Sequence, residues 1–305
     1  MATVTKTIVA TGVSSGLGFE VIKQLLLAQH LPAPTVFPPK AAYNIILGAR
    51  DVTNTRAAFD GLGYDAARHQ VTVLPLELSD LKGTKVFASE VLSLLGAGEK
   101  KKLDFLLLNA AISGSGQKTG PWGWNEGLTV NHFSQHYLTH LLREKLIESK
   151  SRVVVVSSGA VRNVPDTGVL EKELQAGSGV EPMTTYCQTK FVQLLGAHWW
   201  RRQLQGQVEV VAVSPGFIPG TGLGRGSGVT IPPSLPDAKS VPEGAQSILN
   251  AFTRDDIPED PEQIFLTSWG EWWPKDVYGP TLDKALQDKW SPSREEIEEE
   301  AGLSD

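Results

Sequence analysis

Short runs of apolar, β-branched residues alternate along the chain with stretches in which apolar residues recur every three or four positions. The first pattern predicts buried strands and the second predicts amphipathic helices. Strands that alternate with helices favour an α/β fold, in which a doubly wound parallel sheet carries helices on both faces. We therefore expect one such domain over residues 1–305, with about seven strands at 5–10, 43–48, 70–76, 105–108, 152–156, 209–213 and 263–268.

Helical periodicity is clearest in segments at 19–26, 86–95, 125–146, 184–195 and 241–252. Between the sixth strand and the last of these helices, residues 217–240 are rich in glycine and proline, which disfavour regular structure. Because this segment begins at a strand end, where ligands bind in parallel sheets, we expect it to form a flap over a substrate. Residues 270–305 would form a C-terminal extension with an acidic tail.

A glycine-rich turn joins the first expected strand to the first expected helix, with the sequence Thr11-Gly12-Val13-Ser14-Ser15-Gly16-Leu17-Gly18. Glycine lets the backbone turn tightly and approach a ligand closely. The helix that follows offers unpaired amides and a partial positive charge to a pyrophosphate. The spacing G-x-x-x-G-x-G differs from the common dinucleotide fingerprint G-x-G-x-x-G, and a purely structural turn would also explain it. The pattern favours a dinucleotide site and leaves that alternative open.

Four residues that suit ligand binding come at the ends of expected strands, namely Gly12, Arg50, Glu77 and Asn109. The carboxyl ends of parallel strands meet at one edge of a sheet, so we expect these residues to surround one ligand. At the end of the second strand, a carboxylate would accept a hydrogen bond from the 2′-hydroxyl of NAD, whereas an arginine accommodates the 2′-phosphate of NADP. Arg50 therefore favours NADP(H), and the alternative is a solvated surface arginine.

Tyr186 and Lys190 are the residues around which the chemistry can be arranged. Four positions along a helix bring both side chains onto one face, about 6 Å apart along the axis. A fixed ammonium beside a phenol favours the phenolate, so the pair makes a tunable proton donor, although the same spacing occurs on ordinary surface helices. Ser157 and Ser158 follow the fifth strand, where they could simply cap a turn. Asn131, early in the long helix, could simply satisfy a backbone carbonyl.

Composition narrows the class of ligand and the cellular environment. The chain has 28 Lys and Arg against 34 Asp and Glu, a net charge of −6. It has no basic block, which argues against nucleic acid or an anionic membrane surface as a partner. The single cysteine, Cys187, excludes an intrachain disulfide and fits a reducing compartment. No apolar run reaches the length of a membrane span, so we expect a cytoplasmic protein that binds a small molecule.

Three histidines follow one another at helical spacing in the long helix, namely His132, His136 and His140. This arrangement suggests a metal site at first sight. However, no cysteine, aspartate or ligand from another segment stands at the spacing that zinc uses. We therefore expect no metal at this site.

Together these motifs resemble the short-chain dehydrogenase/reductase family over nearly the whole chain. Four marks fall in the family's order, namely the glycine turn, Asn109-Ala110, Ser158 with Tyr186-x-x-x-Lys190, and Pro215-Gly216. The resemblance implies a Rossmann-type fold and a catalytic tetrad, which falls here on Asn131, Ser158, Tyr186 and Lys190. It also implies a set of cofactor contacts, which fall on Gly12, Ser14, Gly16, Leu17, Gly18, Arg50, Glu77, Leu78, Asn109, Ala110, Tyr186, Lys190, Pro215, Gly216, Ile218 and Thr221.

Within the family, the glycine-rich flap and Arg50 are most similar to the carbonyl-reductase, retinol-dehydrogenase and protochlorophyllide-reductase branches, which use NADP(H). The chain departs from the family pattern in a few places. Ala111 replaces the usual glycine after Asn109-Ala110, Glu77 replaces an aspartate, and Thr221 stands one residue late after Pro215-Gly216. The segment between Ser158 and Tyr186 is also longer than usual.

The resemblance implies an NADP(H)-dependent oxidoreductase acting on a small carbonyl or alcohol substrate. Ser158 would hydrogen-bond the substrate oxygen, Tyr186 would donate its proton, and the nicotinamide would deliver hydride to the carbonyl carbon. Lys190 would hold the nicotinamide ribose and lower the pKa of Tyr186, while Asn131 would anchor a proton-relaying water. Two alternatives stay open, reduction of a conjugated C=C bond and a non-catalytic NADP(H)-binding regulator. Substrate identity, reaction direction and a homodimer also stay open.

Overall fold

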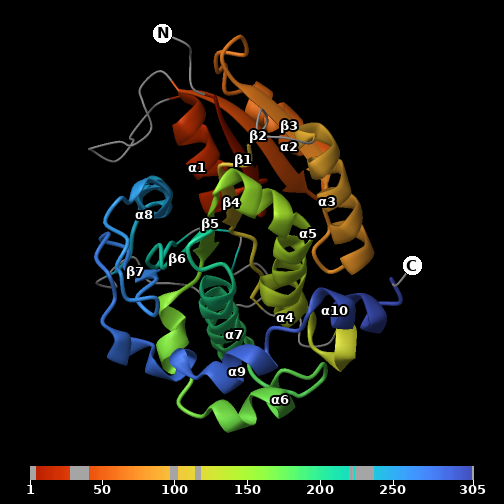
Figure 1. Ribbon diagram of the computed structural model, residues 1–305, viewed down its shortest axis with the longest axis vertical. Helices are drawn as coiled ribbons and strands as arrows, with labels where there is room; N and C mark the ends of the chain where they lie inside the picture. The colour runs from red at the N-terminus through yellow and green to blue at the C-terminus, as the bar shows by residue number, and fades with distance from the viewer. Residues whose placement is uncertain are drawn as a thin grey trace.

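The computed structural model describes residues 5–27, 41–96, 102–113, 118–219, 221, 223 and 237–303. In these residues the chain forms a seven-stranded sheet in the order β3-β2-β1-β4-β5-β6-β7, and every pair of neighbouring strands is parallel (Figure 1). This confirms the predicted doubly wound α/β fold. The strands are β1 Thr5–Ala10, β2 Ala42–Ala49, β3 Gln70–Pro75, β4 Phe105–Leu108, β5 Arg152–Val156, β6 Glu209–Val213 and β7 Phe265–Leu266.

The central strands are apolar along almost their whole length because helices cover both faces of the sheet. In β5, for example, Val153 and Val154 are fully buried although they point to opposite faces. Ile8 of β1 pairs with Ile45 of β2 on one side and with Phe105 of β4 on the other. This register aligns the carboxyl ends of the strands at one edge, which is where the predicted site residues lie.

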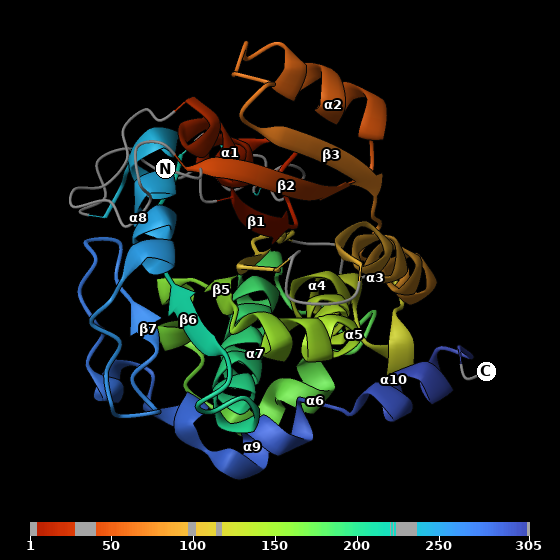
Figure 2. The same ribbon diagram turned by 45° about the horizontal axis from the view of Figure 1, so that its top comes forward.

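Two layers of helices enclose the sheet (Figure 2). Helices α1 and α8 contact each other and share one core cluster with one face of the sheet. Helices α3, α5 and α7 share the other core cluster, on the opposite face. The helix bounds are α1 Gly16–Leu27, α2 Val52–Asp60, α3 Leu81–Leu95, α4 Glu126–Leu128, α5 Ser134–Ser149, α6 Leu170–Glu173, α7 Pro182–Gln203, α8 Val241–Thr253, α9 Lys284–Lys289 and α10 Arg294–Glu300.

The long helix predicted at 125–146 is interrupted. After α4 the backbone passes through a π-helical turn, η2 Thr129–Phe133, before α5 begins. In a π-helical turn, backbone hydrogen bonds join residues five apart instead of the four of an α-helix. The side-chain amide of Gln135 donates hydrogen bonds to the carbonyls of Val130 and Asn131, each at 3.1 Å. These local bonds from Gln135 accompany a feature that helical periodicity could not indicate.

The last strand is shorter than predicted. We expected strand over 263–268, but β7 contains only Phe265 and Leu266, which pair with Ala212 and Val213 of β6. A turn that ends at Gln263 precedes the strand, and a turn that starts at Thr267 follows it. The backbone groups on either side of β7 form hydrogen bonds within these turns, so they do not extend the pairing with β6. The predicted flap at 217–240 lies largely outside the described residues.

The C-terminal extension contains helices that the sequence reading did not predict. The acidic tail forms α10, which begins with a capping box between Ser293 and Glu296. Ile297 is fully buried and packs with Tyr137 of α5 and Leu81 of α3. Helix α9 contacts α7 (Figure 1). Trp290, which directly follows α9 in the sequence, is buried. The extension therefore covers the outer side of the α5/α7 pair.

Candidate active site

The glycine turn after β1 is packed tightly against the end of β4. Gly12 has a φ of +67°, and a Cβ atom at this position would lie 2.6 Å from the Cα of Ala110. A Cβ atom on Gly18 would lie 2.3 Å from the carbonyl oxygen of Gly12. Larger residues would clash with backbone at both positions, so the turn depends on glycine. The structure thus brings together the predicted residues of two separate strand ends.

Side-chain hydrogen bonds stabilise this junction between the glycine turn and the end of β4. The amide of Asn109 donates to the carbonyl of Gly12 at 2.7 Å, and the hydroxyl of Thr11 accepts from the backbone N–H groups of Asn109 and Ala110. Gln135 accepts a hydrogen bond from Thr11 and donates one to the carbonyl of Ala110. The roles of Thr11 and Gln135 were not predicted. The position of Thr11 directly before Gly12 could have indicated its role. Nothing in the sequence around Gln135 indicates that it contacts the strand ends.

Predicted cofactor residues from distant segments also meet beside α1. Leu17 and Ile218 both approach Gly244 of α8, where a Cβ atom would lie 2.8 Å from one side chain and 2.5 Å from the other. Thr221 lies 3.8 Å from the position of a Cβ atom on Gly16. The residues that follow β6 therefore return to the glycine turn, as a site shared by these strand ends requires. Gly244 is a further unpredicted residue of this junction.

The residues at the ends of β2 and β3 have different environments. Arg50 is exposed, and the structure shows no hydrogen bond or ion pair for it among the described residues. The neighbouring Asp51 caps α2 by accepting from the N–H of Asn54 at 2.9 Å, so its carboxylate is engaged. Glu77 accepts from the N–H of Ser79 at 3.0 Å. Ser14 is exposed, Leu78 and Pro215 are buried, and Gly216 has a φ of +92°.

Ser158 and Tyr186 lie together at the carboxyl end of β5. Ser158 is close enough to the Tyr186 phenol to affect its pKa, and the Ser158 hydroxyl accepts from the N–H of Ala160 at 3.1 Å. Burial raises the pKa of Tyr186 to about 12, and the neighbouring Ser158 hydroxyl opposes this shift. Ser157 instead points into the interior, where its hydroxyl is buried without a hydrogen-bond partner. Of the two serines, Ser158 is therefore the one that lies beside Tyr186.

Lys190 is buried beneath Tyr186. Its ammonium donates to the carbonyl of Val156 at 2.9 Å and to Oε1 of Gln193 at 3.1 Å, and it lies 6.0 Å from the centre of the Tyr186 ring. Burial lowers the pKa of Lys190 to about 7. We expected the charge of Lys190 to lower the pKa of Tyr186. In this structure the burial of Tyr186 dominates instead and raises its pKa.

Asn131 lies in the π-helical turn and is fully buried. Its Oδ1 accepts from the N–H of Ile112 at 2.8 Å, and its Nδ2 donates to the carbonyl of Ile112 at 2.9 Å and to the hydroxyl of Thr189 at 2.8 Å. Thr189 directly precedes Lys190. The Asn131 amide therefore ties the segment after β4 to α7, as the structural alternative for this residue suggested.

The three histidines of the predicted stripe point away from this site, toward the C-terminal extension. Nε2 of His132 lies 2.6 Å from the carbonyl oxygen of Trp290, and Nε2 of His136 lies 2.9 Å from that of Pro292. Burial lowers the pKa of His132 and of His140 to about 4. Among the described residues, no group of three or more His, Cys, Asp or Glu side chains is placed to hold a metal ion.

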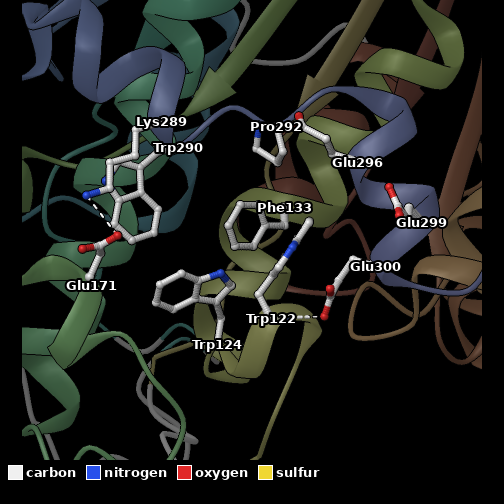
Figure 3. A pocket seen from close by; sticks show the side chains of 10 residues that line it. All are labelled: Trp122, Trp124, Phe133, Glu171, Lys289, Trp290, Pro292, Glu296, Glu299 and Glu300. Atoms are coloured by element: carbon white, nitrogen blue, oxygen red, sulfur yellow. Dashed lines mark hydrogen bonds and ion pairs between the residues drawn. The ribbon is translucent and has the colours of Figure 1, made fainter.

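A cavity of about 490 Å³ also lies beside the C-terminal extension (Figure 3). Aromatic rings of Trp122, Trp124, Phe133 and Trp290 line it, with glutamates of α10 on the opposite side. None of the predicted catalytic or cofactor residues lines this cavity. This cavity is therefore separate from the candidate site, which is defined by the strand ends. No helix in the described part of the chain is long and apolar enough to cross a membrane.

The doubly wound sheet and its glycine turn place the chain among the α/β proteins that bind ligands at their strand ends. No family model matches the chain. The chain is, however, 54% identical over 304 residues to a short-chain dehydrogenase/reductase of Pestalotiopsis microspora, covering 97% of this chain and 99% of that protein. The chain belongs to the short-chain dehydrogenase/reductase family and is an oxidoreductase of that family.

More distant similarities agree with this assignment. Human retinol dehydrogenase 13 is 30% identical over 227 residues, which cover 73% of this chain and 62% of that protein. The carbonyl reductase Sniffer of D. melanogaster has the same fold, with a TM-score of 0.60, 16% identity and coverage of 87% and 97% of the two chains. A short-chain dehydrogenase of Sphingobium yanoikuyae in complex with NADPH gives a TM-score of 0.57, 21% identity and coverage of 81% and 84%.

Proposed function

We propose that the protein is an NADP(H)-dependent enzyme that transfers hydride between the nicotinamide and a carbonyl or alcohol of a small organic substrate. The observation that carries this proposal is the position of Ser158 beside Tyr186 and above the buried Lys190, at the same sheet edge as the glycine turn. A phenol held next to a second hydroxyl suits proton transfer to one oxygen atom.

Ser158 and Tyr186 act on the same substrate oxygen. Ser158 donates a hydrogen bond that orients the carbonyl, and Tyr186 donates the proton that the oxygen needs as it becomes an alcohol. Lys190 remains below the phenol, where its ammonium favours the tyrosinate that forms once the proton has left. Asn131 holds the backbone around this group, and a water bound near it supplies protons toward Lys190. In the oxidation direction Tyr186 accepts the proton instead.

The residues present fit a dinucleotide. Gly12 and Gly18 let the turn pack against the end of β4 where a Cβ atom would clash, and α1 begins at Gly16, so unpaired helix amides face this edge. Gly12, Gly16, Leu17 and Gly18 would hold the pyrophosphate. The residues proposed for the rest of the cofactor are Ser14, Arg50, Glu77, Leu78, Asn109, Ala110, Tyr186, Lys190, Pro215, Gly216, Ile218 and Thr221. The bound nicotinamide supplies or takes up the hydride.

Arg50 supports the choice of NADP(H) over NAD(H). Its guanidinium is exposed at the end of β2, while the adjacent Asp51 carboxylate is engaged in capping α2. A guanidinium suits the 2′-phosphate, and Ser14 in the nearby turn can add a hydroxyl contact. Among proteins of similar fold, the Sphingobium yanoikuyae enzyme was solved with NADPH and an alcohol dehydrogenase of Thermococcus sibiricus with 5-hydroxy-NADP.

A screen of ketones, aldehydes and enones tests this function directly. Loss of NADPH absorbance with a ketone or aldehyde, together with recovery of the corresponding alcohol, is the expected result. Product analysis on an enone separates the two reactions, because a saturated ketone would show C=C reduction and an allylic alcohol would show C=O reduction. If none of these compounds is turned over while NADPH still binds, the protein is a non-catalytic binder and the proposal is wrong.

A further inference from the structure

The cavity beside the C-terminal extension has one wall made of aromatic rings (Figure 3). Its volume of about 490 Å³ falls within the range of about 300–1,000 Å³ that is typical of small-molecule sites. The ring centres of Trp122 and Phe133 lie 5.2 Å apart, and those of Trp124 and Trp290 also lie 5.2 Å apart. Phe133 and Trp290 are buried, whereas Trp122 and Trp124 are partly exposed. Two pairs of packed rings therefore hold this wall in place.

Glutamates of α10 form the opposite side of the cavity. Glu296, Glu299 and Glu300 all line it, and all three are exposed (Figure 3). Glu300 accepts a hydrogen bond from the backbone N–H of Trp122 at 2.8 Å, and Glu296 accepts one from the N–H of Ser293 at 2.7 Å. Neither donor carries a charge. Two of the three carboxylates are therefore held in position with their negative charge uncompensated by these bonds.

The basic side chains near the cavity pair with other acids. Lys289 lines the cavity, but its ammonium lies 3.0 Å from the carboxylate of Glu171, which lines it too. Arg294, the basic residue of α10, pairs with Glu298 at 3.0 Å. Within the described part of the chain, no ion pair reaches the three glutamates that line the cavity. The lining residues together carry a net charge of −3.

This combination of walls selects a class of ligand. The face of an aromatic ring attracts a cation, and tryptophan attracts it most strongly. Carboxylates on the opposite side add to this attraction and repel an anion. A neutral apolar molecule would pack against the rings but would gain nothing from the charges. A metal ion is not favoured, because no group of three or more His, Cys, Asp or Glu side chains in the described residues is placed to hold one.

We propose that this cavity is a second binding site, which takes a small organic cation such as a substituted ammonium. The charged centre lies between the aromatic wall and the glutamates of α10. None of the predicted catalytic or cofactor residues lines the cavity, so the site is distinct from the candidate active site and does not depend on the proposed function. Trp290 and α10 belong to the C-terminal extension, whereas Trp122, Trp124 and Phe133 precede α5, so the ligand contacts both parts.

Calorimetric titration of the full chain with choline tests this site. Choline carries a quaternary ammonium, and 3,3-dimethylbutan-1-ol has the same shape without the charge. We expect choline to bind with a Kd of about 1 mM or lower, at least about 10-fold more tightly than the neutral alcohol. Absence of choline binding overturns the proposal. Equal affinities for the two compounds also overturn it, because the cavity would then recognise shape and not charge.

Two variants, each with a matched control, locate the binding. Trp124→Leu should weaken choline binding by about 5- to 30-fold through loss of one ring. Trp269→Leu, which removes an exposed tryptophan that does not line the cavity, should leave it unchanged. Glu299→Gln should weaken choline binding by about 2- to 5-fold, because the charge it removes is exposed. Glu295→Gln removes the same charge from α10 at a position that does not line the cavity, and should have no effect.

Equal losses in a variant and its control would show that choline binds elsewhere. If Trp124→Leu does not fold, the two glutamate variants still decide the outcome, since both side chains are exposed. Saturating NADPH should leave the Kd of choline unchanged, and displacement of choline by NADPH would place it at the strand ends and overturn the proposal. Failure of the proposed function would be seen separately, as absence of turnover in the substrate screen.

Discussion

Two polar clusters beside the α5/α7 pair differ in how their hydrogen bonds are completed. The strand-end cluster consists of Asn131, Ser158, Tyr186 and Lys190, with Ser158 contributed by the end of β5. The histidine stripe consists of His132, His136 and His140 on the outer side of the pair. Both contain buried titratable groups with shifted pKa values. Burial and pKa therefore do not distinguish a catalytic cluster from a structural one here.

The two clusters differ in where they lie on the fold and in which part of the chain covers them. Backbone carbonyls of Trp290 and Pro292 bond the histidine stripe, and the C-terminal extension covers it. The strand-end cluster lies at the carboxyl edge of the sheet, where the glycine turn and Arg50 also lie. Lys190 uses two of its three N–H donors on Val156 and Gln193. We infer that the strand-end cluster binds ligand and reacts, whereas the histidine stripe attaches the extension.

The largest effect should come from Tyr186→Phe in the strand-end cluster. The ring packing is kept and only the proton is lost, so NADPH binding should remain nearly unchanged. We expect kcat to fall by about 10²- to 10⁴-fold, the usual range for general acid catalysis. Steady-state kinetics with a substrate from the screen, alongside NADPH titration, measure both quantities. A variant that retains more than about a tenth of wild-type kcat would show that Tyr186 is not the acid.

Arg50→Ala should give the next largest effect, on cofactor choice. Hydrogen bonds from a guanidinium to a phosphate are worth about 1.5 to 3 kcal/mol, which corresponds to a preference of about 10- to 150-fold for NADPH over NADH. A contact from the Ser14 hydroxyl to the same phosphate can preserve part of this preference in the variant. The Kd of each cofactor is measured for wild type and variant at one ionic strength. Equal wild-type affinities, or equal weakening of both by the mutation, would remove the main support for NADP(H).

The histidine stripe should make the folded state sensitive to acid. Burial lowers the pKa of His132 from its usual 6.5 to about 4, so between these values the unfolded chain binds a proton that the folded chain does not. The contribution to stability is therefore complete above pH 6.5 and is lost as the pH falls toward 4. Between pH 7 and pH 5, His132 should account for a loss of about 2 kcal/mol of unfolding free energy.

Urea unfolding at pH 7 and pH 5 tests this contribution. His132→Gln keeps a donor that can face the carbonyl of Trp290 but does not titrate, so its loss of stability between the two pH values should be about 2 kcal/mol smaller than that of wild type. An identical pH dependence for the two proteins would show that the ring of His132 titrates normally, and the histidine stripe would then not be sealed by the extension.

Chelation should have no measurable effect if the histidine stripe is structural. Treatment with a chelator should leave turnover unchanged, and elemental analysis of the purified protein should find no stoichiometric metal. Discovery of about one zinc per chain, lost together with activity, would reverse our assignment of the two clusters. The same assay on Tyr186→Phe serves as the baseline for inactive protein.

Much of the fold could be predicted because it depends on local patterns. The β-branched run at Arg152–Val156 is apolar on both faces, which indicates a central parallel strand. The motif from Thr11 to Gly18 predicted a turn between β1 and α1, and the structure shows that Gly12 and Gly18 leave no room for a side chain. Helical spacing of Tyr186 and Lys190 placed them on one face of α7. These signals need only the residues within one element and its neighbours.

Tertiary structure decided the rest, because the responsible contacts join residues far apart in sequence. Gln135 bonds carbonyls of the π-helical turn and also bonds Thr11 and Ala110 at two strand ends. The pKa of Tyr186 rises rather than falls, because burial exceeds the effect expected from Lys190. The extension covers the histidine stripe through carbonyls that any residue type could supply. A hydrogen bond to a distant backbone carbonyl leaves no pattern in the local sequence, so only the folded chain reveals it.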